Sequence, residues 1–233
     1  MKAVVIYSGG MDSFTLLHYL IHKGYDVYAL SFDYGQRHAK ELRYAQQVCA
    51  KNEVPHHVID LRCLNPLLQG SSLTSDIDVP EGHYSESNMK DTVVPNRNMI
   101  MLSIATGWAV SIGAHEVFTA VHAGDHDVYP DCRKEFIDAM TATTLISNYA
   151  PVKIQAPFID IDKGGILSIG EECGLTDYDY RHAWTCYKGG YKACGKCGAC
   201  VERLEAFDSV GWTDPIVYKD EDFWKEAVAN AKR

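Results

Sequence analysis

The chain has 233 residues, of which 46% are hydrophobic and 23% are charged, as is usual for a globular protein that buries its own core. It carries 22 basic and 31 acidic side chains and a formal charge of −9, which disfavours general binding of nucleic acids because their phosphates must be neutralised. The most apolar stretch, residues 99–114, contains Ser, Thr and Gly and is too short to span a bilayer, so we expect a buried helix and no membrane contact.

The first two-thirds of the sequence alternates between strand patterns and helix patterns. Strands are predicted at Ala3–Tyr7, Val27–Phe32, His56–Leu61 and Glu116–Val121. Helices are predicted at Asp12–Lys23, Lys40–Asn52, Asn98–Gly113 and Arg133–Ser147. This alternation predicts an α/β fold with a doubly wound parallel sheet, because right-handed strand–helix–strand units place helices on both faces.

The rest of the chain departs from this alternation. Residues Arg62–Pro95 form a long irregular stretch rich in Ser, Asp, Asn and Pro, and loops of this length in compact domains are typically lids or binding loops. Helices are predicted at Lys163–Glu172 and from Asp220 to the end of the sequence. We therefore predict an α/β domain over residues 1–160 and a small C-terminal appendage over residues 161–233, which together form one continuous unit.

The segment Ser8-Gly9-Gly10-Met11-Asp12-Ser13 joins the first predicted strand to the first predicted helix. Glycines at this position let the backbone turn tightly and approach a ligand, and the unpaired N–H groups of a helix N-terminus attract anions. Asp12 can bind Mg²⁺ there. The alternative is an ordinary strand–turn–helix joint in which Asp12 or Ser13 caps the helix.

Four of the eight cysteines lie close together near the C-terminus, at Cys186, Cys194, Cys197 and Cys200. Thiolates two residues apart can share one metal ion, and four of them close a tetrahedral zinc site that has no open position for catalysis. The alternatives are disulfides and an iron–sulfur cluster. The N-terminal residues show no secretory signal pattern, so we expect a cytoplasmic protein, in which metal binding is favoured over disulfides.

Two polar segments follow predicted strands, Asp33–His38 after the second strand and His122–Arg133 after the fourth. In open α/β sheets, ligands bind beyond the carboxyl ends of strands, so Arg37 and His38 can face phosphates. Asp125 suits a base, a metal ligand or a hydrogen-bond partner of a heterocycle. For each of these residues the alternative is an ordinary solvated loop.

A third polar segment, Pro95–Asn98, opens the apolar predicted helix. Arg97 stands at the entrance of this helix, where a guanidinium can bind a phosphate with two parallel hydrogen bonds. The alternative is a solvated helix cap. Arg97 is therefore a candidate site residue whose role depends on where the fold places it.

Together, these motifs resemble one family. The segments S-G-G-M-D-S, Y-G-Q-R-H, P-N-R-N, Y-P-D-C-R and T-C-Y followed by C-G-K-C-G-A-C-V-E-R match in the same order and spread over nearly the whole chain. The first looks like the PP-loop of the ATP pyrophosphatase superfamily, and the whole set resembles the 7-cyano-7-deazaguanine synthases (QueC-like) of queuosine precursor biosynthesis. Met11 stands where relatives often have Gln or Leu, at a position that contributes mainly its backbone.

The resemblance implies a Rossmann-like fold of the HUP, or adenine nucleotide alpha hydrolase, type with a small zinc-binding appendage. It also implies an enzyme, a ligase that forms C–N bonds, which converts 7-carboxy-7-deazaguanine and free ammonium to 7-cyano-7-deazaguanine. ATP would be cleaved to AMP and diphosphate through adenylated intermediates. The implied cofactors are Mg²⁺ and one structural Zn²⁺, and the implied state is a cytoplasmic homodimer with no nucleic-acid partner.

The resemblance also assigns residues. The ATP site is expected at Tyr7, Ser8, Gly9, Gly10, Met11, Asp12, Ser13, Phe14, Thr15, Leu16 and Leu17, and the zinc site at the four clustered cysteines. Arg37, His38 and Arg97 are candidates for stabilising charge in the transition state, and Asp125 for catalysis or for reading the heterocycle. The alternatives are another PP-loop enzyme, such as a tRNA thiolase or lysidine synthetase, which the acidic charge disfavours, and a non-enzymatic zinc-knuckle binding module.

Overall fold

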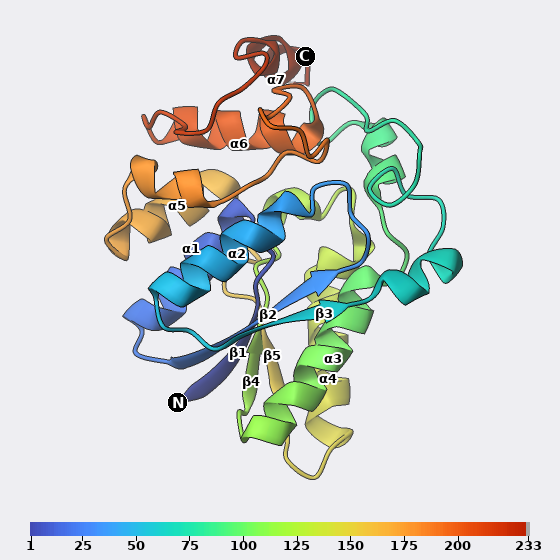
Figure 1. The fold of residues 1–233 in the computed structure, drawn as a ribbon, viewed down its shortest axis with the longest axis vertical. Coiled ribbons are helices and arrows are strands. Elements are labelled where there is room, and N and C mark those ends of the chain that lie inside the picture. The colour runs from blue at the N-terminus through green and yellow to red at the C-terminus, as the bar shows by residue number, and fades with distance from the viewer. Residues whose placement is uncertain (232–233) are drawn as a thin grey trace.

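The computed structural model describes residues 1–231 and contains a five-stranded parallel sheet (Figure 1). Its strands are β1 (Lys2–Ile6), β2 (Asp26–Asp33), β3 (His56–Asp60), β4 (Glu116–Phe118) and β5 (Lys153–Gln155). They lie in the order β3-β2-β1-β4-β5, and every neighbouring pair is parallel. The order reverses between β1 and β4, and open α/β sheets bind ligands outside the carboxyl ends of strands at such a point.

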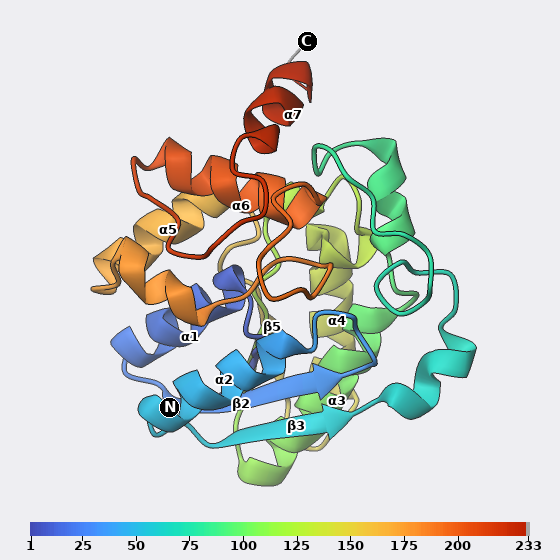
Figure 2. The same ribbon diagram turned by 45° about the horizontal axis from the view of Figure 1, so that its top comes forward.

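Helices cover both faces of this sheet (Figures 1 and 2). One face carries α1 (Met11–His22), α2 (Lys40–Lys51) and α5 (Lys163–Glu172), and the other carries α3 (Arg97–Ile112) and α4 (Lys134–Ile146). Beyond α5 lies α6 (Gly198–Ser209), and α7 (Phe223–Ala231) packs against α6. Short 3₁₀ helices occur at Arg62–Leu67, Ser87–Thr92, Ala123–Asp125, Pro130–Cys132 and Asp177–His182.

The central strand β1 is buried on both sides. Successive side chains of a strand point to opposite faces, so Ala3 and Val5 join the core beneath α1 and α5, and Val4 joins the core beneath α3. Leu17 of α1 and Leu102 of α3 are among the side chains that complete these two cores. The apolar run that predicted the first strand therefore belongs to the middle of a three-layer structure, as expected for parallel sheets.

The four predicted strands and the predicted α1–α5 helices are all present. Two elements were missed. β5 has only three residues, too few for a period-two pattern to be visible, and α6 carries the buried charged residues Glu202 and Arg203, which hide its apolar face. The helix predicted from Asp220 begins at Phe223, and its last two predicted residues lie outside the described ones. Within residues 1–231, no helix has the length and apolar character needed to cross a membrane.

The irregular segment 62–95 runs from β3 to the C-terminal part of the molecule (Figure 2). There Glu81 forms an antiparallel bridge with Cys197, and the Gly82 N–H donates to the carbonyl of Lys196 at 3.0 Å. Regular structure within this segment is limited to two short 3₁₀ helices. The segment therefore connects the edge of the sheet to the region that contains the clustered cysteines.

Arg203 on α6 is a fully buried arginine that joins three parts of the C-terminal region. Its Nε and Nη2 donate to the two carboxylate oxygens of Asp214 at 2.7 and 2.9 Å. Its Nη1 also donates to the carbonyl of Ala183 at 2.9 Å, and Nη2 to that of Tyr180 at 3.1 Å. Because both charges are removed from water, the pair depends on complete hydrogen bonding.

Replacing Arg203 by Met should therefore destabilise the fold strongly. Loss of one partner leaves Asp214 as an uncompensated buried charge, which typically costs about 3–5 kcal/mol of unfolding free energy. The matched control is Lys225→Met, since Lys225 forms an exposed ion pair with Asp222 and such pairs contribute little to stability. Urea unfolding measures both variants, and equal midpoints for the two would contradict this account.

Candidate active-site cleft

A cleft lies at the carboxyl ends of β1, β2 and β4, where the strand order reverses. Its walls come from the segments that follow these strands, from the first residues of α3 and α5, and from the chain around residue 185. The predicted site residues that line it are Tyr7, Ser8, Gly10, Met11, Asp12, Ser13, His38, Arg97 and Asp125. Motifs that are far apart in the sequence thus meet at one edge of the sheet.

The other predicted residues of the ATP and catalytic sets lie outside the lining; they are Gly9, Phe14, Thr15, Leu16, Leu17 and Arg37. Phe14, Leu16 and Leu17 are buried in the core beneath α1, and the hydroxyl of Thr15 is 2.7 Å from that of Tyr180. Arg37 turns toward the segment 62–95, where its Nε donates to the carbonyl of Ser75 at 3.0 Å. Arg37 therefore ties two loops together at the surface.

The turn after β1 depends on Gly9. Its φ is +88°, a left-handed conformation that residues with a side chain rarely adopt. A β-carbon at this position would lie 2.3 Å from the carbonyl oxygen of Glu41 on α2. The two backbones approach so closely that a side chain has no room, and α2 thereby fixes the path of the loop.

Gly10 is the N-cap of α1, and no side chain caps the helix. Asp12 and Ser13 lie inside the first turn, so the alternative in which one of them is the cap is wrong. The hydroxyl of Ser13 donates to the Gly10 carbonyl at 3.0 Å, and that of Ser8 accepts from the Gly10 N–H at 3.1 Å. The uncapped first turn borders the cleft, which is the arrangement that anion binding at a helix N-terminus requires.

Asp12 faces a buried lysine that the sequence analysis did not identify. Its Oδ2 is 3.6 Å from Nζ of Lys163, which also forms an ion pair with Glu202. Burial alone would lower the pKa of Lys163, but Asp12, Glu202 and Asp125 raise it above its ordinary value, so the side chain stays cationic. Oδ1 of Asp12 is buried without a hydrogen-bond partner. A free carboxylate oxygen beside an anion-binding turn fits a hard divalent cation such as Mg²⁺.

His122 lies beneath this acidic group and is 1% exposed. Its Nδ1 accepts a hydrogen bond from the Gly124 N–H at 3.1 Å, so the neutral ring carries its proton on Nε2. Nε2 is 3.5 Å from Asp125 Oδ2 and 3.9 Å from both Asp12 Oδ2 and Glu202 Oε1. Nε2 therefore lies among three carboxylates but forms no hydrogen bond to any of them.

Arg97 stands on the opposite side of the cleft, at the first residue of α3. Its Nη1 donates to the hydroxyl of Tyr34 at 3.4 Å. The helix start that carries it is fixed by Asp131, whose Oδ2 accepts from the Asn98 N–H at 3.1 Å and whose carbonyl accepts from Asn98 Nδ2 at 3.2 Å. The P-N-R-N and Y-P-D-C-R motifs thus meet directly, and the second holds the first in place.

His38 and Glu41 form a buried pair next to Arg97. His38 Nε2 is 3.5 Å from Glu41 Oε1. Burial and, to a smaller extent, Arg97 lower the pKa of His38 to about 3, and burial raises the pKa of Glu41 to about 8. His38 is thus neutral near pH 7 and can stabilise a ligand only as a hydrogen-bonding group, without a charge of its own.

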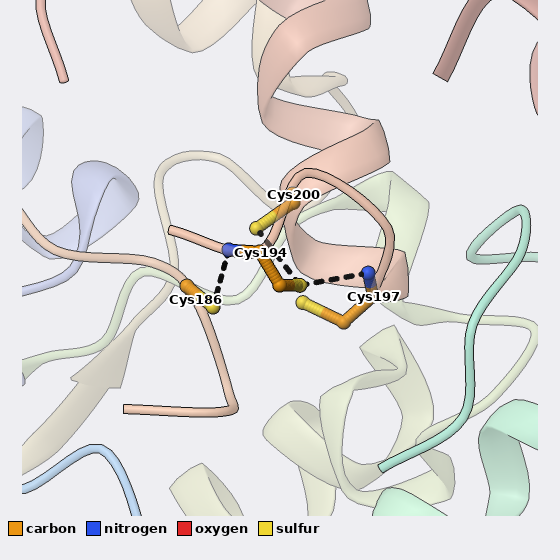
Figure 3. Close-up of side chains that lie close together, drawn as sticks. All are labelled: Cys186, Cys194, Cys197 and Cys200. Atoms are coloured by element: carbon orange, nitrogen blue, oxygen red, sulfur yellow. Dashed lines mark hydrogen bonds between the residues drawn. The ribbon is translucent and has the colours of Figure 1, made fainter. Parts of the chain in front are cut away.

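The four clustered cysteines are all buried, and their sulfur atoms lie within 4.8 Å of one another (Figure 3). Backbone N–H groups of Cys194 and Cys197 donate to the sulfur atoms of Cys186 and Cys194, both at 3.2 Å. Ligands at the usual Zn–S distance of about 2.3 Å place tetrahedral sulfur atoms roughly 3.8 Å apart, so the set fits one metal ion. None of the four forms a disulfide bond.

Comparison with known proteins places this chain in a family. The family model described as "Queuosine biosynthesis protein QueC" matches residues 2–211. The chain belongs to the QueC family. A 7-cyano-7-deazaguanine synthase from Marinobacter nauticus is 59% identical over 218 residues, which cover 94% of this chain and 97% of the relative. One from Alteromonas mediterranea is also 59% identical over 218 residues, covering 94% and 99%.

Solved structures support the fold of this QueC-family chain. A 4-thiouridine synthetase in complex with RNA and ATP has a TM-score of 0.50 and 17% identity, covering 99% of this chain and 50% of that one. NMN synthetase from Francisella tularensis has a TM-score of 0.50 and 12% identity, covering 99% and 86%. At these identities the likeness concerns the fold alone. The predicted fold class, a doubly wound α/β sheet of the HUP type followed by a cysteine cluster, is confirmed.

In this QueC-family chain, the cysteine cluster is braced directly against the turn after β1. The N–H of Trp184 donates to the carbonyl of Gly9 at 2.9 Å, and its indole Nε1 donates to the carbonyl of Cys186 at 3.0 Å. The ammonium group of Lys40 lies 3.8 Å from the centre of the indole ring, within the range of a cation–π contact. The C-terminal region therefore contributes to the wall of the cleft as well as to the cysteine cluster.

Three buried charged residues at or beside the cleft were missed in the sequence, namely Glu41, Lys163 and Glu202. Each lies on a helix at a position where the pattern of apolar and polar residues is also compatible with an exposed charged side chain. Lys163 had one usable signal, because it follows Asp162, whose Oδ1 accepts from the Gly165 N–H at 2.8 Å as an N-cap. That cap places Lys163 at the start of α5, facing the sheet edge where ligands bind.

Replacing Glu41 by Gln tests the buried carboxyl group. Since its folded pKa is raised from 4.5 to about 8, the folded state binds this proton more tightly than the unfolded state does. The resulting stability is fully present below about pH 4.5 and is lost as the pH rises toward about 8. Urea unfolding across this range should therefore show a smaller loss of stability for Glu41→Gln than for the wild type. The same pH dependence in both proteins would contradict the assignment.

Proposed function

We propose that the protein is a 7-cyano-7-deazaguanine synthase of queuosine precursor biosynthesis. It would convert 7-carboxy-7-deazaguanine and free ammonium to the nitrile, cleaving ATP to AMP and diphosphate, as a ligase that forms C–N bonds. The names of the relatives support this reaction. The observation that carries the proposal is the uncapped turn at Gly10, placed beside Lys163 and the free Oδ1 of Asp12.

The phosphates of ATP are assigned to the side of the cleft formed by α1 and α5. Backbone N–H groups of the first turn after Gly10 would bind the diphosphate, with the hydroxyls of Ser8 and Ser13 beside them. Lys163 supplies a positive charge that persists in the buried site. Asp12 would hold Mg²⁺, which neutralises phosphate charge when it is bound.

The overall reaction removes two oxygen atoms from the carboxylate, and each removal needs a leaving group. In the first stage a carboxylate oxygen attacks the α-phosphorus of ATP, the bond to the bridging oxygen breaks and diphosphate leaves. Ammonia then adds to the acyl carbon, and AMP and a proton leave to give the amide. In the second stage the amide oxygen attacks a second ATP in the same way, and loss of AMP and a proton leaves the nitrile. Both stages use the same phosphate side of the cleft.

The remaining residues of the cleft are assigned by their charge. Arg97 supplies a fixed positive charge opposite the phosphates, and neutral His38 supplies a hydrogen bond. Asp125 lines the cleft with one carboxylate oxygen near His122, and we assign it to a hydrogen-bond donor of the deazaguanine. Arg37 is left out, because its guanidinium is engaged with Ser75. We further propose a cytoplasmic homodimer, which the family resemblance supports.

Incubation with 7-carboxy-7-deazaguanine, ammonium chloride and Mg-ATP should give the nitrile and AMP, detected by mass spectrometry. Two ATP should be consumed for each nitrile formed. The matched variant is Ser13→Ala, because the Ser13 hydroxyl lies 3.0 Å from that of Ser8 in the turn. Its turnover should fall by about 10²–10³, the cost of losing a hydroxyl that can turn from the Gly10 carbonyl to donate to developing charge. Formation of ADP, or no change in the acid, would overturn the proposed function.

We propose that the four cysteines hold one structural zinc ion. Sulfur ligation without an open position gives zinc no role in the reaction, and binding of the metal stabilises the folded chain. Purified protein should be colourless and contain one equivalent of zinc, and a strong chelator should lower the thermal unfolding midpoint. Elemental analysis and thermal unfolding measure these. A brown protein that absorbs near 400 nm, roughly where iron–sulfur clusters absorb, would contradict the assignment to zinc.

A further inference from the structure

The two cations of the cleft come from opposite layers of the fold. Lys163 belongs to α5 and lies with the turn after β1 on one face of the sheet, whereas Arg97 belongs to α3 on the other face. The cleft at the sheet edge is where these two layers meet. A ligand that fills it therefore meets one positive charge beside the phosphate-binding turn and a second one across the sheet edge.

Arg97 has no carboxylate within ion-pair distance among residues 1–231. Asp131, whose charge helps to raise the pKa of Arg97, is hydrogen-bonded to Asn98. Burial alone would lower the pKa of Arg97, but its surroundings, Tyr34 first, raise it above its ordinary value, so it stays charged. In contrast, the buried Arg203 is fully paired with Asp214. A partly buried cation without a counter-ion is costly, and a ligand anion would remove that cost.

The wall around Arg97 consists of neutral hydroxyl groups with a defined hydrogen-bond direction. Thr92 donates to the carbonyl of Met89 at 2.6 Å, so it must accept from the hydroxyl of Tyr129, which is also 2.6 Å away. Tyr129 can then only accept from Tyr187, at 3.4 Å. Burial raises the pKa of Tyr129 and that of Tyr187, which keeps both rings neutral. This wall brings no anion to Arg97.

Tyr34 differs from these residues because its proton is free. Its hydroxyl oxygen accepts from Arg97 Nη1 at 3.4 Å, which leaves the O–H of Tyr34 to donate to a ligand. Burial raises the pKa of Tyr34 to about 12, so the hydroxyl keeps this proton near neutral pH. A guanidinium and a phenol O–H side by side can bind the two oxygens of one carboxylate.

We propose that Arg97 and Tyr34 form the subsite for the carboxylate of the substrate acid, separate from the phosphate side of the cleft. This inference rests on the proposed function, because it concerns which group of that substrate meets which cation. Because we assign the phosphates to the turn after β1 and Lys163 in the other layer, Arg97 is left for the carboxylate. The carboxylate that Arg97 and Tyr34 would bind is present in the substrate acid and absent from the amide intermediate. The two residues would therefore bind the acid in the first stage of the reaction but find no such anion in the second.

The test compares the acid with the amide, 7-carboxamido-7-deazaguanine, as alternative substrates for Arg97→Gln. Loss of a charge-assisted hydrogen bond should raise the KM for the acid by about 10- to 100-fold, and the KM values for the amide and for ATP should change by less than about threefold. Tyr34→Phe should show the same selectivity with a smaller effect, about five- to tenfold on the acid. The matched control is Arg62→Gln, since Arg62 pairs with Asp60 at the surface and should match the wild type.

A second substitution of Arg97 and a check of folding separate loss of the carboxylate subsite from a general loss of structure. Arg97→Lys retains the charge but loses the two-armed geometry, so its KM for the acid should lie between those of the wild type and Arg97→Gln, and circular dichroism should show that each variant is folded. Equal losses with acid and amide, or a raised KM for ATP, would overturn the carboxylate subsite and leave the proposed function intact. If the wild-type protein converts neither compound, the proposed function itself fails and this inference fails with it.

Discussion

The turn after β1, to which we assign the phosphates, is held in place by contacts of its own backbone. Gly9 presses against the carbonyl of Glu41 on one side, and its carbonyl accepts a hydrogen bond from Trp184 at 2.9 Å on the other. Neither contact involves a side chain of the turn, so the N–H groups after Gly10 remain free for a ligand. The rest of the cleft is arranged around this fixed point, because α2 and the cysteine-bearing region must both reach it.

Charge in the cleft follows the layers of the fold. On the α1 and α5 side, carboxylates outnumber the one lysine, and Nε2 of His122 lies among them without a hydrogen bond. This mixture of carboxylates and one lysine suits a divalent cation together with phosphates, because the cation is attracted by the carboxylates and the phosphates by the lysine. On the α3 side, Arg97 is surrounded by neutral hydroxyls. A doubly wound sheet thus separates the two proposed anion sites while keeping them within reach of one ligand.

The sequence predicts those site residues whose role is set by their near neighbours along the chain. It does not predict residues whose role depends on contacts with distant segments. The turn after β1 and the cysteine cluster were recognisable because spacing along the chain determines both. Arg37 and Arg97 looked equally suitable in the sequence, and only the fold separates them, since Arg37 is engaged with Ser75 across the surface. Lys163 was missed because its burial depends on α6, and α6 was hidden by its own buried charges Glu202 and Arg203.

The contact between Gly9 and Trp184 joins one of the first segments of the chain to one of the last. During synthesis on the ribosome, the turn after β1 emerges early, well before the residues that brace it. A nascent chain that ends before residue 184 has the sequence of the turn and the strands on either side of it, but an incomplete cleft wall. The wall of the proposed nucleotide site would then be completed late in biogenesis, together with the segment that carries the cysteine cluster.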